Sequence, residues 1–199
     1  MTTPQDIQQQ LIQAVQAIPT DNPYSAAEDI LFNQCHQQHG RIITTGVGKA
    51  GTIAYLLATK FASTGTSAQF LSPLEAVHGD LGMMGLADVL IAFSNSGKTR
   101  EIVELIPIAQ DLHPYLKVIC ITGKAASPLA AASHVTLLTG DTPEVCPFGL
   151  MPSSSTLAMD TIGNILAVQL MERIGFTQTD YAKRHHGGYL GEKARQTAA

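Results

Sequence analysis

Three short segments of the sequence combine glycines and hydroxyl residues in a way that suits an anion. Residues 45–51 read TGVGKAG, residues 94–99 read SNSGKT, and residues 153–156 read SSST and open a long apolar stretch. Glycine turns, hydroxyl groups and helix N-termini supply the donors that usually bind phosphate. A helix cap needs only one hydroxyl, so this density of donors favours a phosphate-bearing ligand over three coincidental caps. The predicted binding residues are Gly48, Ser94, Asn95, Ser96, Thr99, Ser153, Ser154 and Ser155.

The first segment also fits a dinucleotide fingerprint, because Gly46, Gly48 and Gly51 have the GxGxxG spacing. That fingerprint requires an acidic residue about 20 residues further on, at the end of the second strand. The corresponding region reads QFLSP, and the nearest carboxylate, Glu75, lies beyond it. A nicotinamide dinucleotide is therefore disfavoured, and a tight turn without a ligand is the other alternative for this segment alone.

Strands and helices must bring these segments to one place. Short apolar runs predict strands at 41–45, 68–71, 88–94, 117–122 and 134–138, and the run Val89–Phe93 does not alternate, as is typical of a parallel sheet buried on both faces. Helix-length stretches lie between them at 49–63, 74–82, 99–112 and 127–133, and a last one at about 154–174 ends at Gly175. Two helical segments precede the strands: one ends before Pro19, and the second, about 23–38, has Gly40 as its C′ residue.

This order predicts an α/β fold with a five-stranded, doubly wound parallel sheet. Ligands of such folds bind beyond the carboxyl ends of the strands, where the strand order reverses. No linker or repeat divides the chain, so we expect one domain over residues 1–199, with N-terminal helices at about 4–39.

Composition excludes several classes of partner. The 199 residues contain 12 Lys and Arg against 16 Asp and Glu, a net charge of −4, which speaks against nucleic acid or an anionic membrane as partner. No apolar run approaches the roughly 20 residues of a membrane span, and the Gln-rich start is unlike a signal peptide. Three distant cysteines fit neither a disulfide framework nor a cysteine-rich metal site, so we expect a reducing cytoplasm. The charged fraction of 14% is low, which suggests that partner subunits cover part of the surface.

Further motifs, together with the segments above, resemble the sugar isomerase (SIS) domain of arabinose 5-phosphate isomerases. These motifs occur in the family's order over about residues 40–191: GVGKAG at 46–51, FASTGT at 61–66, EAVHGDLG at 75–82, SNSG at 94–97, CPFGLMPSSST at 146–156 and HHGG at 185–188. The resemblance implies a three-layer αβα sandwich of flavodoxin-like strand order, assembled as a homotetramer with sites shared between subunits. It also implies interconversion of D-arabinose 5-phosphate and D-ribulose 5-phosphate without a cofactor, the first step toward the lipopolysaccharide sugar Kdo.

The same resemblance places the family's functional positions on Lys49, Glu101, Glu144 and His185. His78 matches a further site histidine, near which divalent metals bind in some members. Together with Asp80 it makes a poor zinc signature, and no metal is required for moving a proton.

The sequence departs from the family in four respects. The common long form carries two CBS domains after the SIS domain, and this chain contains neither. Ala50 stands where serine is usual, Lys98 where glutamate is usual, and His186 where proline is usual.

The expected chemistry gives each of these residues a task. Moving a carbonyl between C1 and C2 requires ring opening and then a base that shuttles a proton through an enediolate. Glu144 is the favoured base, because it lies in a proline-containing loop, whereas Glu101, in the first turn of a helix, is explained by the helix dipole and is assigned an orienting or second acid–base role. Lys49 would neutralise the phosphate or the enediolate. His185 would open the ring or protonate an oxygen, from a flexible tail that reaches a site in its own or a neighbouring subunit.

Two other functions remain open. One is isomerisation of another sugar phosphate, as by 6-phospho-3-hexuloisomerase or a capsule-related variant. The other is a non-catalytic SIS module that senses a phosphosugar or the end product CMP-Kdo. Such regulators usually carry a DNA-binding helix-turn-helix, for which residues 1–40 have too few Lys and Arg. A sensor would also be expected to lose the acid–base residues, which are all present here, so the isomerase is favoured.

Overall fold

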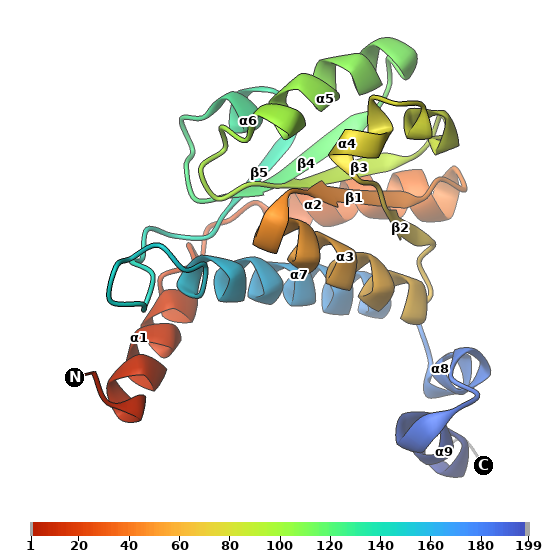
Figure 1. Cartoon of the computed structure of the whole chain (residues 1–199). Coiled ribbons are helices and arrows are strands. Elements are labelled where there is room, and N and C mark those ends of the chain that lie inside the picture. The colour runs from red at the N-terminus through yellow and green to blue at the C-terminus, as the bar shows by residue number, and fades with distance from the viewer. Residues whose placement is uncertain (1, 198–199) are drawn as a thin grey trace.

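The computed structural model describes residues 2–197, in which a parallel sheet lies between two layers of helices (Figure 1). The strands are β1 (Ile42–Gly46), β2 (Ala68–Phe70), β3 (Val89–Phe93), β4 (Lys117–Thr122) and β5 (Val135–Leu138). Their order is β2-β1-β3-β4-β5, and every pair is parallel; Ile42 pairs with Ala68 on one side and with Val89 on the other. The predicted αβα sandwich with flavodoxin-like order is confirmed, and the order reverses between β1 and β3.

Side chains of the central strands alternate between two buried clusters, as a pleated sheet requires. In β3, Val89, Ile91 and Phe93 belong to one cluster and Leu90 and Ala92 to the other. All five are fully buried. The absence of polar alternation in the sequence therefore reflects helices on both faces of the sheet.

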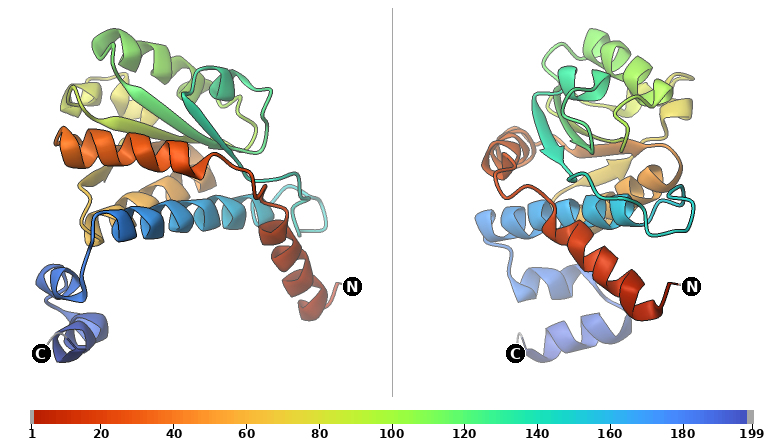
Figure 2. Two further views of the ribbon diagram at one scale, coloured as in Figure 1. Left: turned by 180° about the vertical axis from the view of Figure 1, so that it is seen from behind. Right: turned by 90° about the vertical axis from the view of Figure 1, so that its left-hand side faces the viewer.

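The first cluster lies under α2 (Tyr24–Leu31), its π-helical continuation η1 (Phe32–Gln37), α3 (Gly48–Ser63) and α7 (Ser154–Arg173). The second lies under α4 (Pro73–Ala76), the 3₁₀ helix η2 (Asp80–Met83), α5 (Arg100–Leu112) and α6 (Pro128–Ala131). The remaining helices, α1 (Pro4–Gln16), α8 (Gln178–Arg184) and α9 (Gly188–Thr197), project from this body, α1 at one end of α7 and α8 and α9 at the other (Figures 1 and 2). None of the helices that the structure describes combines the length and apolar character of a membrane-spanning segment.

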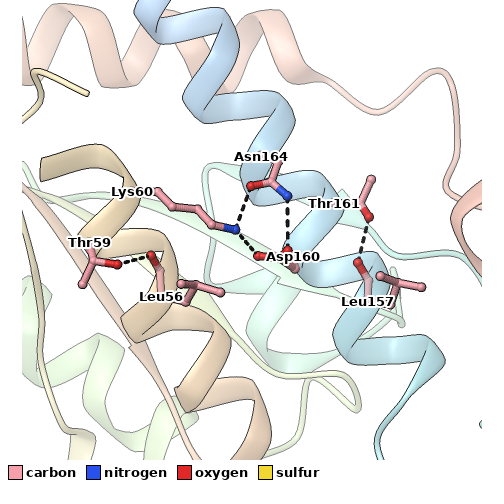
Figure 3. A network of polar contacts seen from close by, with 7 residues as sticks. All are labelled: Leu56, Thr59, Lys60, Leu157, Asp160, Thr161 and Asn164. Carbon is pink, nitrogen blue, oxygen red and sulfur yellow. Dashed lines mark hydrogen bonds and ion pairs between the residues drawn. The ribbon is translucent and has the colours of Figure 1, made fainter. Parts of the chain in front are cut away.

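A polar network joins the two long helices of the first layer (Figure 3). Lys60 of α3 donates from Nζ to Asp160 Oδ1 at 2.5 Å and to Asn164 Oδ1 at 2.8 Å, both on α7. Asn164 in turn donates to Asp160 Oδ2 at 3.2 Å. Because the network fixes α7 against α3, it also fixes the N-termini of these helices relative to each other.

The structure corrects three local predictions. His39 (φ +60°), and not Gly40, takes the left-handed conformation at the end of the helical segment. Gly40 instead allows the backbone of Ala87 to approach closely, because a Cβ at Gly40 would lie 2.0 Å from the Ala87 carbonyl oxygen. The stretch 74–82 forms two short helices rather than one, because Gly79 (φ +123°) interrupts it. The segment after Gly175, where the sequence predicted no further helix, contains α8 and α9.

The amino edge of the sheet provides a test of stability. The Asp88 carboxylate is 3% exposed and accepts hydrogen bonds from Arg41 N (2.7 Å), Gly85 N (2.8 Å) and Arg41 Nη2 (2.9 Å). Asp88→Ala leaves these donors without their acceptor, so the free energy of unfolding should fall by about 3 kcal/mol. Urea unfolding followed by circular dichroism at fixed protein concentration measures this.

The control for Asp88 is Asp141→Ala. Asp141 pairs with Lys124 at 2.9 Å, but its side chain is 90% exposed. Loss of such a surface pair should cost less than about 1 kcal/mol. Equal losses for the two variants would contradict the special role of the Asp88 contacts.

Candidate active site

A cleft of about 400 Å³ opens at the carboxyl edge of the sheet. Its walls come from the loop after β1 with the start of α3, the loop after β3, and the segment that joins β5 to α7. The lining residues are Val47, Lys49, Ala50, Ser94, Asn95, Ser96, Thr99, Glu144, Gly149, Leu150, Pro152, Ser155, Thr156 and Met159. The cleft thus lies where doubly wound sheets bind ligands, and it brings together all three segments that the sequence indicated.

The first wall is the glycine turn that leads into α3. Gly48 has φ +60°, a conformation that side chains disfavour, and it begins the helix directly before Lys49. Gly51 stands where a Cβ would lie 2.5 Å from the Gly46 carbonyl oxygen, so this glycine lets α3 pack tightly against the end of β1. Lys49 is exposed in the first turn of the helix and lines the cleft. Gly48 itself shapes the turn, but lines a separate shallow hollow with Tyr55 and Phe70.

The second wall is the turn between β3 and α5. Ser94 is buried, and its Oγ lies 2.7 Å from Thr99 Oγ1 and accepts a hydrogen bond from Gly97 N at 3.1 Å. Asn95 and Ser96 are exposed. The turn is thus fixed from within by Ser94, while Asn95 and Ser96 lie exposed at the wall of the cleft. The segment predicted to bind phosphate is therefore a preformed feature of the cleft.

The third wall contains a contact that the sequence did not indicate. Glu144 accepts hydrogen bonds from Ser153 N (2.7 Å), Ser153 Oγ (3.0 Å), Ser155 N (3.3 Å) and Ser155 Oγ. Its carboxylate therefore lies on the N-terminus of α7, where the helix dipole and the unpaired N–H groups favour an anion. The expectation that no helix terminus accounts for Glu144 was wrong, because the loop returns it to α7.

This contact determines the ionisation of Glu144. Partial burial by itself raises the pKa of the Glu144 carboxyl, but the hydrogen bonds from Ser155 and Ser153 outweigh burial, so the pKa lies below the ordinary glutamate value. At neutral pH the side chain is an ionised carboxylate fixed at the wall of the cleft. Ser153 and Ser155, which the sequence predicted to bind phosphate, donate their hydrogen bonds to the carboxylate of Glu144 instead. Ser154 between them is fully buried, and its Oγ has no partner among the described residues.

The segment from Cys146 to Pro152 folds over the cleft as a compact turn. Cys146 Sγ accepts hydrogen bonds from Leu150 N (3.1 Å) and Met151 N (3.2 Å), and these donors lower the pKa of the thiol. The turn contributes Gly149, Leu150 and Pro152 to the cleft. Sequence reasoning did not single these residues out, although they lie within the motif at 146–156 that carried the family resemblance.

Glu101 and His78 are also absent from the lining of the cleft, as are Gly48, Ser153 and Ser154. Glu101 lies in the first turn of α5, two residues after Thr99, and among the described residues no hydrogen bond or ion pair holds its carboxylate. His78 is exposed on the turn between α4 and η2. Within residues 2–197, no group of three or more His, Cys, Asp or Glu side chains is arranged to hold a metal ion.

His185 lies far from the cleft of its own chain. The cleft includes Ser155 and Thr156 in the first turn of α7, whereas His185 follows α8, beyond the other end of that helix (Figure 1). The 20 residues of α7 span about 30 Å at 1.5 Å per residue. His185 therefore does not reach the cleft of its own chain.

Lys98 faces a second hollow of about 380 Å³, beside the cleft. The two share Ser96, and Lys124 and Asp141 also line the second hollow. The lysine that departs from the family pattern therefore lies next to the cleft and not in it.

Several known proteins are similar to this chain in sequence or in fold. The family model of the SIS domain matches residues 36–169. Arabinose 5-phosphate isomerase KdsD from Salmonella typhi is 49% identical over 154 residues, which are 77% of this chain and 46% of that protein. The chain thus spans about half the length of the curated relatives it matches.

Two solved structures are similar over most of their length. A proposed phosphosugar isomerase involved in capsule formation, from Bacteroides fragilis, has 51% identity and a TM-score of 0.91, covering 93% of this chain and 96% of that one. A protein of E. coli CFT073, in complex with arabinose 5-phosphate, has 35% identity and a TM-score of 0.81, covering 90% and 93%.

The contacts of Glu144 lead to a prediction about its ionisation. Ser155→Ala removes the hydroxyl donor, so the pKa of Glu144 should rise. A carboxyl whose pKa is lowered by folding stabilises the protein at high pH, and this contribution is lost as the pH falls through the folded-state pKa. The variant should therefore lose about 1 kcal/mol of unfolding free energy at neutral pH and progressively less in acid.

Carbon-13 NMR titration of the glutamate carboxyls measures this pKa, and Glu144→Gln assigns the resonance. Ser96→Ala is the control, because Ser96 lines the same cleft while its hydroxyl accepts a hydrogen bond from Lys98 N and makes none with Glu144. An unchanged Glu144 titration in Ser155→Ala would show that the serine does not set its pKa.

Proposed function

The chain belongs to the SIS domain family, and from this premise we propose that it is an aldose–ketose isomerase that interconverts D-arabinose 5-phosphate and D-ribulose 5-phosphate. The observation that carries the proposal is the cleft, in which Lys49, the turn with Ser94 and the carboxylate of Glu144 meet. The identity with KdsD and the E. coli relative bound to arabinose 5-phosphate support this substrate.

The phosphate of the substrate would bind at the turn between β3 and α5. Asn95 and Ser96 are exposed there, and Thr99 lines the same wall. Lys49 adds a positive charge from the first turn of α3, which is unfavourable for the helix but favourable beside an anion. Lys49 would thus neutralise the phosphate or the enediolate, whichever lies nearer in the bound state.

Glu144 is the proposed base. In the direction from ribulose 5-phosphate, it takes a proton from C1, and the electrons form the C1–C2 enediolate. The proton then returns to C2, and the proton of the C1 hydroxyl passes to the C2 oxygen as the aldehyde forms at C1. The hydrogen bonds from Ser153 and Ser155 keep the carboxylate ionised and oriented before the substrate arrives. Glu101 stays a proposed second acid–base or orienting group, from the first turn of α5.

His185 is the proposed group for opening the sugar ring. Because α7 separates it from the cleft of its own chain, the proposal requires that a neighbouring subunit supply it. A homotetramer with shared sites would satisfy this requirement. It would also explain the low charged fraction of 14%, since part of the surface would be covered by partners.

The wider role follows from the substrate. We propose that the product enters Kdo synthesis for lipopolysaccharide in the cytoplasm, that no cofactor takes part, and that CMP-Kdo is a further ligand. The Bacteroides fragilis relative, involved in capsule formation, favours a capsule-related sugar phosphate as the second candidate substrate.

Turnover in deuterium oxide tests the reaction. Ribulose 5-phosphate should give arabinose 5-phosphate with deuterium at C2, seen by proton NMR, because the enediolate exchanges its proton with solvent. Glu144→Gln should lower kcat by at least about 10³-fold while phosphate still binds. Glu104→Gln, an exposed glutamate of α5, is the matched control and should stay active.

Absence of turnover with every pentose and hexulose phosphate, combined with tight binding of CMP-Kdo, would favour the non-catalytic alternative. Full activity of Glu144→Gln would remove Glu144 from the role of base. Turnover without deuterium at C2 would contradict the exchange of the enediolate proton with solvent.

Mixed oligomers test the sharing of sites. Glu144→Gln and His185→Ala should each be inactive alone, but subunits of the two variants mixed by refolding should regain about a quarter of wild-type activity, because one site in four receives both native residues. His186→Ala, the adjacent exposed histidine, serves as the control for the substitution itself. If mass spectrometry shows hybrids and no activity returns, Glu144 and His185 do not act in one shared site.

A further inference from the structure

Specific contacts hold both the ring and the backbone of His185, which a surface tail would not require. His185 lies in the segment that joins α8 to α9, the two helices beyond the end of α7 (Figure 2). We propose that Tyr181 is a positioning residue that fixes the His185 imidazole with its proton on Nδ1 and its lone pair on Nε2. This inference rests on the proposed role of His185 in ring opening.

The contact of Tyr181 with His185 is twofold. The two rings are stacked with their centroids 3.7 Å apart and their planes 8° from parallel. In addition, His185 Nδ1 lies 3.0 Å from the carbonyl oxygen of Tyr181. The four-residue separation explains both contacts, since residues i and i+4 of a helix lie on the same face.

The carbonyl contact determines the tautomer. A carbonyl oxygen can only accept a hydrogen bond, so Nδ1 must carry the proton. In the neutral ring, Nε2 then has a free lone pair, and within the described residues no hydrogen bond occupies it. The Tyr181 ring keeps the imidazole in the plane in which Nδ1 points at the carbonyl, just as outer partners fix the tautomer of catalytic and metal-binding histidines.

The backbone of His185 is held from the other side by α9. Gly191 packs so closely that a Cβ would lie 2.0 Å from the His185 carbonyl oxygen. Arg195 donates from Nη1 to the same oxygen at 3.1 Å and to the His186 carbonyl oxygen at 3.5 Å. The helix α9 therefore fixes the main chain of His185, while Tyr181 fixes its ring.

This orientation suits the opening of a furanose ring. Nε2 accepts the proton of the hydroxyl at C1 as the bond between C1 and the ring oxygen breaks. The imidazolium then returns a proton to the ring oxygen, so the histidine ends in its starting state. A ring protonated on Nε2 could not accept the first proton, and the Nδ1 lone pair would face the chain itself.

The test compares Tyr181→Ala with Tyr181→Phe, which keeps the stacked ring. In the wild-type background, Tyr181→Ala should lower kcat at least about tenfold with little change in KM. Tyr181→Phe should keep nearly the wild-type kcat and KM. In the His185→Ala background, Tyr181→Ala should change the residual kcat less than about twofold, because a positioning residue has no effect without its target. Equal losses in both backgrounds would overturn the proposal.

Nitrogen-15 NMR of the His185 ring provides a readout that does not depend on activity. The wild-type protein and Tyr181→Phe should show the Nδ1-protonated neutral form, whereas Tyr181→Ala should show a substantial population protonated on Nε2. An unchanged tautomer in Tyr181→Ala would also overturn the proposal. If Tyr181→Ala fails to fold, Tyr181→Leu replaces it, since leucine keeps the apolar contact without the aromatic stack.

The single variant His185→Ala separates this inference from the proposed function. Wild-type activity in His185→Ala would refute the role of the histidine itself. An impaired His185→Ala together with a fully active Tyr181→Ala would leave that role intact and refute only the positioning by Tyr181.

Discussion

The attachment of Glu144 to the N-terminus of α7 is the interaction on which the candidate site depends. The four hydrogen bonds from Ser153 and Ser155 close the segment between β5 and α7 into a loop, and this loop carries Gly149, Leu150 and Pro152 to the cleft. The same bonds keep the carboxylate ionised, because they outweigh the effect of burial on its pKa. One contact therefore shapes a wall of the site and prepares the group that is proposed to act there.

Such an arrangement carries a chemical compromise. A carboxylate held by several donors is well oriented but is a weaker base than a free one, since the donors stabilise its charge. A substrate hydroxyl or carbonyl that competes for Ser155 would release part of this stabilisation and raise the basicity of Glu144 when it is needed. The Lys49 ammonium and the turn with Ser94 would meanwhile stabilise the negative charge that moves from the carboxylate to the sugar.

The sequence predicted the fold closely because the determinants are local. Apolar runs without alternation mark strands buried on both faces, and all five strands were found within two residues of the expected bounds. The errors arose where tertiary contacts decide: Gly40 is a glycine because Ala87 approaches it, and the helices α8 and α9 contribute no residue to the two buried clusters of the core. Within the site, the glycine and hydroxyl turns were visible as motifs, whereas the contact of Glu144 depends on how a loop returns to α7. No rule based on the spacing of residues in the sequence predicts the path of this loop.

The length of α7 separates the two parts of the proposed machinery. At one end of this helix lie Glu144 and the cleft; at the other, α8 and α9 hold His185 by its ring and by its main chain. A histidine that served only its own surface would not need a stacked tyrosine, an arginine on its carbonyl and a glycine packed beneath it. Because about 30 Å of rigid helix prevents His185 from reaching the cleft beside it, these contacts are explained most simply if the histidine is presented to another copy of the chain. The isolated subunit would then contain every group of the site, but no complete site.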